Sequence, residues 1–321
     1  MTFEQFTQQV IDTLEYRLNK NGKKYEFEKT TIRKMNQTKE AIQCKIANNN
    51  VGLSLYLDDI IDHAGLNINE INTVPDKIIE MIIKSIETRI NQIPDYNVND
   101  FVDMVKDFDR SKEHILPYII SINNNQNMLN TVPYTILIDD LAIIYKVRVN
   151  TNVNGEENSM SSLITNQLLK NYGKTIDELH ATALENLKKP GYAQLFTIAE
   201  IIMNKKFYFD DVLKKPISKY LLSLSNNMLV ITNRYINCGA SVILYKELMD
   251  HILQELNVNE LYIIPSSIHE MIVMPVYDDM NTEEAEDTIK QIINDVNCKD
   301  IPPEDVLSGS LYLYDGYLKS I

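Results

Sequence analysis

The fold is decided by residues 261–276, which read LYIIPSSIHEMIVMPV. Two apolar runs flank the pair Ser266 and Ser267, and this pattern predicts an antiparallel hairpin. Periodicity predicts a strand and a helix before the hairpin and a helix and a strand after it, at residues 228–232, 239–256, 281–296 and 310–314. The resulting order, β-α-β-β-α-β, is the split pattern of a ferredoxin-like layer of helices on an antiparallel sheet.

The N-terminal part of the chain has a different pattern. Apolar residues recur at spacings of three and four from Phe3 to Leu18, which predicts an amphipathic helix. Three alternating stretches and a second amphipathic helix follow, at residues 25–32, 41–47, 51–57 and 75–91. Asn and Gly between the stretches predict turns, so we expect an antiparallel meander within an α-β-β-β-α unit.

The middle of the chain holds one strong strand signal and two helices. From Leu141 to Val149, apolar residues alternate with a second set that ends in Lys146 and Arg148. Helices are predicted at 161–172 and 175–187. We therefore predict an α+β protein with an N-terminal α+β domain, a helical connecting region and an acidic C-terminal domain, at residues 1–155, 156–225 and 226–321.

Charge is distributed unevenly along the 321 residues. The formal net charge is −14, and residues 247–321 contribute −13 of it, with 16 Asp or Glu against 3 Lys or Arg. Nucleic-acid binding depends on Lys and Arg that neutralise phosphates, so direct contact of this region with DNA or RNA is not expected. An acidic surface either keeps a protein in solution or attracts a basic partner, and both interpretations stay open.

Secretion and membrane insertion are not indicated. The first residues include Glu4 and lack the apolar core of a signal peptide, and no apolar run approaches about 18 residues. Cys44, Cys238 and Cys298 are odd in number, widely spaced and never arranged as CxxC, which argues against a disulfide framework and a zinc knuckle. We expect a cytoplasmic protein that does not associate with membranes.

The predicted hairpin carries the residue types of a serine hydrolase. Ser267, His269 and Glu270 supply a nucleophile, a base and a carboxylate, with Ser266 beside them. Residues two apart on a strand lie about 6 to 7 Å from each other, so Ser267 and His269 meet only if the turn bends them together. No GxSxG motif accompanies them. The alternative is a structural turn whose serines cap backbone groups.

Signals for metal and nucleotide binding are weak. Asp59 and His63 are four residues apart, as metal ligands on a helix often are, but no further ligand accompanies them. The chain contains neither GxGxxG nor GxxxxGK. Cys238 stands at a helix start, where a reactive thiol and a structural cysteine are both possible. We expect neither a metal nor a cofactor.

Three segments resemble a family of uncharacterised bacterial proteins of unknown function. They are the hairpin stretch 261–270 with its Leu/Ile-Pro-Ser-Ser-Ile-His-Glu motif, residues 231–245, and residues 303–308. The resemblance extends over most of the chain. It implies no activity, cofactor or catalytic residue.

Two classes of function follow. The first is a non-enzymatic interaction or regulatory protein that binds a basic partner, for instance as an inhibitor of a nucleic-acid enzyme. Its binding residues would be the acidic cluster of Asp278, Asp279, Glu283, Glu284, Glu286 and Asp287. The second is a hydrolase or small-ligand sensor that uses the Ser266–Glu270 hairpin. Partner identity and oligomeric state do not follow from the sequence.

Overall fold

A computed structural model describes residues 1–19, 25–46, 52–91, 98–153, 156–203, 210–278, 280 and 282–321. The described chain forms two compact units, residues 1–104 with Val153 and residues 105–152 with 156–321. The α+β class is confirmed, because both units combine helices with antiparallel sheets. Within the described ranges, no helix has the length and apolar character needed to span a membrane.

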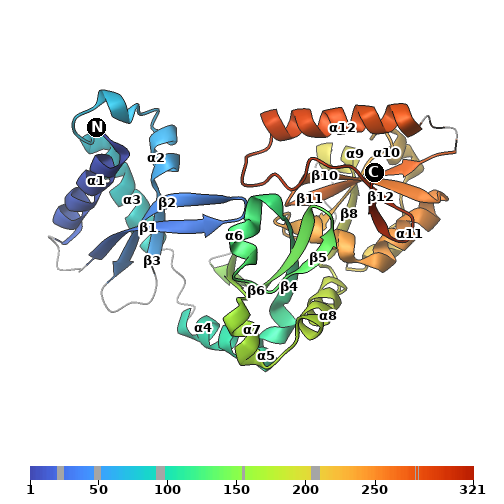
Figure 1. The fold of residues 1–321 in the computed structure, drawn as a ribbon, viewed down its shortest axis with the longest axis horizontal. Coiled ribbons are helices and arrows are strands. Elements are labelled where there is room, and N and C mark those ends of the chain that lie inside the picture. The colour runs from blue at the N-terminus through green and yellow to red at the C-terminus, as the bar shows by residue number, and fades with distance from the viewer. Residues whose placement is uncertain are drawn as a thin grey trace. The chain divides into compact units, whose positions relative to one another are not determined.

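The first unit is a three-stranded meander packed against helices (Figure 1). Its elements are α1 (Phe3–Leu18), β1 (Tyr25–Lys34), β2 (Gln37–Ile46), β3 (Gly52–Tyr56), α2 (Leu57–His63) and α3 (Asp76–Asn91). A capping box between Thr2 and Gln5 starts α1, because each side chain accepts from the other's backbone N–H. One core joins α1 and α3 to the sheet and includes Phe6, Leu14, Ile42, Ile79 and Ile86. The predicted α-β-β-β-α order is confirmed.

The second unit begins with a four-stranded sheet. After α4 (Val98–Lys106) and α5 (Phe108–Ser111), the chain forms β4 (Ile115–Ser121), α6 (Gln126–Leu129), β5 (Thr135–Ile138), β6 (Leu141–Val153) and β7 (Glu156–Leu163). β6 is the common partner of the other three strands. Tyr118 on β4 is paired with Ile144 on β6, so it shares a face of the sheet with Lys146 and Arg148.

A six-stranded antiparallel sheet forms the rest of the second unit. Its order is β13-β12-β10-β11-β9-β8. The strands are β8 (Ala193–Thr197), β9 (Leu229–Asn233), β10 (Glu260–Ser267), β11 (Glu270–Val276), β12 (Tyr312–Tyr314) and β13 (Leu318–Ser320). The predicted hairpin, β10 with β11, lies at the centre of this sheet. The expected ferredoxin-like layer is not confirmed, because β8 and β13 are additional edge strands and β12 pairs with β10 instead of with β9.

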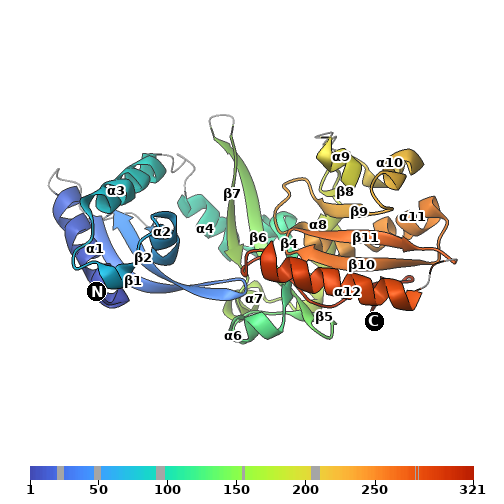
Figure 2. The ribbon, with the colours of Figure 1, turned by 90° about the horizontal axis from the view of Figure 1, so that it is seen from above.

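Helix α12 (Thr282–Lys299) lies against β10 on one face of this sheet (Figure 2). It buries Ile289 and Ile293 in a cluster with Tyr262 and Leu311. These isoleucines recur at the helical spacing that predicted the helix. The opposite side of α12 is mainly polar and exposed, and Glu283, Glu284 and Asp287 lie there.

Three predictions about the middle of the chain need correction. The expected helix 239–256 is divided into a 3₁₀ segment, η6 (Gly239–Leu244), and α11 (Lys246–Leu256). The expected helix 161–172 starts only at α7 (Asn166–Tyr172), because residues up to Leu163 pair with β6 as β7. The region 156–225 is not purely helical, since it contributes β8 next to α8 (Ile176–Leu187), α9 (Ile198–Ile202) and α10 (Lys219–Ser223). The three-domain division stays a prediction.

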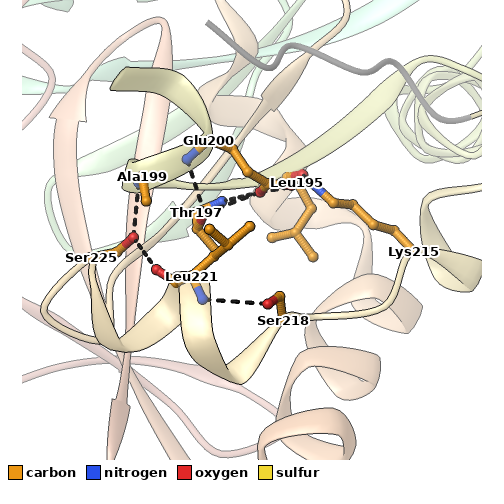
Figure 3. Close-up of polar contacts among 8 residues, drawn as sticks. All are labelled: Leu195, Thr197, Ala199, Glu200, Lys215, Ser218, Leu221 and Ser225. Carbon is orange, nitrogen blue, oxygen red and sulfur yellow. Dashed lines mark hydrogen bonds and ion pairs between the residues drawn. The ribbon is translucent and has the colours of Figure 1, made fainter. Parts of the chain in front are cut away.

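Lys215 forms a buried ion pair with Glu200 of α9 and also bonds to Leu195 of β8 (Figure 3). Its side chain is only 5% exposed, and Nζ lies 3.0 Å from Glu200 Oε2 while also donating to the Leu195 carbonyl. Glu200 in turn accepts from the Thr197 backbone N–H at 2.7 Å, at the start of α9. This lysine therefore has a full counter-charge inside the protein.

Asp140 connects the turn before β6 to a much later part of the chain. Its carboxylate accepts hydrogen bonds from the hydroxyls of Ser308 at 2.6 Å, Ser310 at 3.1 Å and Tyr312 at 2.7 Å. Burial is the main cause that raises the pKa of Tyr312, so this phenol stays protonated and donates. The contact holds the two sheets of the second unit together.

Candidate functional site

The turn of the β10–β11 hairpin brings Ser266, Ser267, His269 and Glu270 together. Ser267 Oγ accepts a hydrogen bond from the backbone N–H of His269 at 3.0 Å, and Ser266 Oγ donates to Glu270 Oε1 at 3.4 Å. Ser267 is buried, with a bulge in the strand beside it. Both serines thus bond within the turn, Ser267 to a backbone group and Ser266 to a side chain.

The imidazole of His269 is held by two other parts of the chain. Its Nδ1 accepts from the backbone N–H of Cys238 at 3.0 Å, which places the ring proton on Nε2. Nε2 lies 3.3 Å from Asp305 Oδ1 and faces this carboxylate. Both ring nitrogens therefore have partners other than the Ser267 hydroxyl. The hydrolase hypothesis stays a prediction for which this geometry provides no available base.

Gly239 lets the chain after β9 approach the hairpin closely. Its N–H donates to the His269 carbonyl at 3.0 Å. A Cβ at this position would lie 2.3 Å from Thr232 Oγ1, 2.5 Å from the Asn233 nitrogen and 2.7 Å from the His269 oxygen. Two of these atoms belong to the backbone and cannot move aside cheaply, so no other residue fits here. The glycine positions Cys238 against His269.

Cys238 is a protonated thiol in this setting. Burial raises its pKa most strongly, while the positive charges of Lys146 and Arg148 oppose the rise. Because the net pKa is raised, the nucleophilic thiolate is disfavoured at neutral pH. Of the two interpretations of Cys238, the geometry favours the structural one. Because both positive charges act on the pKa of Cys238, Lys146 and Arg148 lie close to this cysteine.

These cations, Lys146 and Arg148, form a group that we call the basic cluster. Arg148 is 9% exposed, and its guanidinium carbon lies 4.8 Å from the ring centre of Tyr235. Lys146 Nζ lies 4.7 Å from the ring centre of Tyr118. Burial lowers the pKa of Lys146, and repulsion from Arg148 adds to the effect. In the sequence, both residues stand at the more polar positions of an alternating strand, a pattern that predicts no function for them.

The acidic cluster lies mainly on α12. Glu283, Glu284 and Asp287 are exposed on this helix, and Asp278 is exposed before it, whereas Asp279 lies outside the described residues. Glu286 differs, because it accepts from the Tyr262 hydroxyl at 3.2 Å and faces the sheet. The structure therefore groups three of the predicted acids on one open surface and gives a fourth a packing partner.

Two hollows lie next to each other along α12. The first, of about 330 Å³, is lined by Glu283, Glu284, Asp287, Thr288 and Gln291. The second, of about 320 Å³, is lined by Met274, Glu284, Ala285, Thr288 and Ile289. They share Glu284 and Thr288. An acidic hollow and a mainly apolar one thus adjoin on a single helix.

The Asp59 and His63 pair lines a cavity of about 350 Å³ in the first unit. Asp59 is bound to Lys39, with Oδ1 2.7 Å from Nζ, so its charge is already balanced. Across the described ranges, no three His, Cys, Asp or Glu side chains are grouped as metal ligands. Among these described residues, none joins Asp59 and His63 as a third ligand.

Comparison with known proteins bears on the identity of the chain. One family of unknown function, DUF5688, matches residues 3–316. The chain belongs to DUF5688. No curated protein and no solved structure matches it significantly. Membership in DUF5688 therefore brings no activity to this chain, and its function has to be argued from the geometry above.

Proposed function

We propose that this DUF5688 protein is an interaction or regulatory protein that binds a basic protein segment along α12. The observation that carries the proposal is the pair of hollows that share Glu284 and Thr288. A purely acidic surface would attract any cation. An acidic hollow joined to an apolar one favours a segment with Lys or Arg next to an apolar side chain.

The chemistry of the two hollows defines the expected partner. Carboxylates of Glu283, Glu284 and Asp287 would attract Lys or Arg and speed the encounter. Met274, Ala285 and Ile289 would receive the apolar side chain, whose burial adds affinity that salt does not screen. One turn beyond Thr288, Ile292 is exposed and extends the apolar contact. Attraction and burial then act on the same segment.

A nucleic-acid enzyme with a basic groove is one partner of this kind. The same carboxylates repel phosphates, so DNA or RNA itself would not bind here. If the partner uses a nucleic-acid groove, added DNA or RNA would compete with this protein for it. We place the interaction in the cytoplasm, a proposal supported by three unpaired cysteines, including the exposed Cys298.

The test is affinity capture with the wild-type protein and two charge-matched variants. The first variant carries Glu283→Lys, Glu284→Lys and Asp287→Lys on α12. The control carries Glu15→Lys, Glu80→Lys and Glu87→Lys, three exposed acids of the first unit, and changes the net charge equally. Capture is run at about 0.05 M and about 0.5 M salt, which spans strong and weak screening.

We expect one basic partner to bind the wild type and the control but not the α12 variant. Its recovery should fall at the higher salt without disappearing, because apolar contact remains. Thermal melts establish that all three proteins are folded. Equal loss in the control variant would mean that net charge alone attracts the partner. Retention by the α12 variant would refute the proposed surface.

A further inference from the structure

The guanidinium of Arg148 is buried without a close partner for its donors. Nε donates to Asn150 Oδ1 and a terminal nitrogen donates to the Asn237 carbonyl, both at 3.4 Å. These distances exceed the usual range of about 2.7 to 3.2 Å for such bonds. The Tyr118 hydroxyl accepts a further hydrogen bond from Arg148, and this phenol is neutral because burial raises its pKa. The five N–H donors of this side chain are therefore poorly satisfied.

Within the described part of the chain, the basic cluster also lacks a counter-charge. Among the described side chains, neither Lys146 nor Arg148 forms an ion pair with a carboxylate. Asp305 is the nearby acid that acts on Cys238, but its carboxylate faces the imidazole of His269. Asp210 lies beside the exposed Arg234 instead, near Gly191. Two cations thus share a largely buried face without a carboxylate bound to either.

Such an arrangement is costly unless something else balances the charge. Removing a cation from water is unfavourable, and two cations that repel each other add to the cost. Proteins accept a buried charge when it is paired, coordinates a ligand or binds a substrate. Ser241 adds a further unmet group, because its buried hydroxyl has no hydrogen-bond partner and it lies on η6, which packs against β4.

We propose that Lys146 and Arg148 bind the phosphate group of a small molecule between β6 and the turn of residues 234–238. Guanidinium groups bind phosphate through paired N–H donors, and lysine adds a point charge. The rings of Tyr118 and Tyr235 lie against the two cations and hold them side by side through cation–π contacts. This site is independent of the surface on α12.

The ligand can reach this site from the turn side. Asn237 is exposed and Tyr235 is half-buried, so the turn forms the outer wall. The contact of Arg148 with the Asn237 carbonyl is long, and a phosphate oxygen at a normal distance would replace it with a stronger, charge-assisted bond. Binding would exchange the long contact with the Asn237 carbonyl for this charge-assisted bond.

The experiment measures thermal stability of the full chain with inorganic phosphate, with glycerol phosphate and with acetate. Potassium chloride at equal ionic strength is the reference. A ligand that binds the native state raises Tm in a concentration-dependent way. We expect both phosphates to raise Tm by a few degrees over chloride, and acetate to do much less.

Three variants locate the effect. Arg148→Met and Lys146→Met each remove one cation and keep an unbranched apolar chain. Lys170→Met is the matched control, an exposed lysine of the same unit. The first two should weaken phosphate binding about tenfold or more in Kd, as expected for loss of a charged hydrogen bond, and the control should leave it unchanged.

Each outcome decides the proposal. Circular dichroism and the Tm in chloride show whether Arg148→Met folds, and Lys146→Met, at a less buried position, serves if it does not. If the phosphates raise Tm no more than potassium chloride does, the effect is one of ionic strength and the proposal is overturned. Stabilisation that survives in both cluster variants would place the anion elsewhere and overturn it as well. Equal stabilisation by acetate would refute the preference for phosphate.

Discussion

Lys215 and Arg148 are both buried cations of the second unit, and the protein treats them in opposite ways. Lys215 meets Glu200 at 3.0 Å and a backbone carbonyl, inside a closed network (Figure 3). Arg148 is nearly as buried, yet its acceptors are two amide oxygens at 3.4 Å and the neutral Tyr118 hydroxyl, none of them a carboxylate. The first cation is balanced by its own chain. The second is left with donors that its own chain does not fully use.

This difference separates a structural charge from a functional one. A paired charge depends on its partner, so removing one member leaves the other buried and unpaired. An unpaired charge has no dependent carboxylate, and the protein gains little from it while the site is empty. Burial alone therefore does not identify a binding site. What identifies a binding site is a buried charge that has no counter-charge within hydrogen-bonding distance.

The largest expected effect is that of Lys215→Met. It leaves the Glu200 carboxylate largely buried without its cation and should lower the free energy of unfolding by about 3 to 5 kcal/mol. Urea denaturation followed by circular dichroism measures the loss. The double variant Lys215→Met with Glu200→Leu should recover much of it, because no unpaired charge remains. A double variant as unstable as the single one would contradict this account.

Arg148→Met should have a much smaller effect on stability without ligand. No carboxylate depends on Arg148, and methionine keeps the apolar stem, so the change should stay within about 1 kcal/mol in either direction. The same urea titration in chloride buffer checks it. A loss comparable to that of Lys215→Met would show that Arg148 is structural and would remove the contrast between the two sites.

A half-buried base can also avoid the problem by staying neutral, as His180 does. Its Nδ1 lies 2.9 Å from the Tyr145 hydroxyl, and burial lowers its pKa despite an opposing contribution from Asp177. The unfolded chain therefore takes up a proton first as pH falls below about 6.5, so stability declines from that pH downward and is retained above it. His114 has a pKa lowered by burial too and acts with the same sign.

Thermal melts between about pH 7.5 and 5.5 measure this decline. His180→Gln should show a shallower fall in Tm over that window than the wild type. His63→Gln, at an exposed position of the first unit, is the control and should follow the wild-type curve. An unchanged slope in His180→Gln would mean that other groups govern the acid response.

Exposed acids should give the smallest effects on stability. Asp287→Asn on the open side of α12 is expected to change the free energy of unfolding by less than about 0.5 kcal/mol. Glu286→Gln weakens the bond from the Tyr262 hydroxyl and should cost about 1 kcal/mol. Urea titrations of the two variants make the comparison. The reverse order would mean that Asp287 has a packing role.

Much of the fold follows from apolar periodicity. The central hairpin, α12 and the N-terminal meander are present because residues such as Ile289 and Ile293 repeat at the spacing of the structure that they form. β7 was missed because its sequence, EENSMSSL, is polar and lacks alternation. Residues 239–244 were predicted as part of an α-helix but form the 3₁₀ segment η6. Cys238, directly before η6, has a φ of 52° in the left-handed region, which the sequence did not indicate.

The candidate site was only partly predictable for a different reason. His269 and the serines are adjacent in sequence, so their turn could be located. Asp305 and Cys238 are distant in sequence, and only the folded chain brings them to the imidazole. Lys146 and Arg148 occupy the polar positions of an alternating strand, which usually face water. In the folded protein, η6 packs against β4 on that side. The alternation within one strand does not indicate which element will pack on it.

The bond between Asp140 and Tyr312 has a consequence for the protein while it is being made. The two residues are 172 positions apart, so the ribosome delivers the phenol long after the carboxylate. At about 5 to 20 residues per second, the turn before β6 waits roughly 9 to 34 s for its partners. During that interval the Asp140 carboxylate has none of the three hydroxyl donors that it binds in the folded protein. The join between the two sheets is therefore completed only after the last strands have been synthesised.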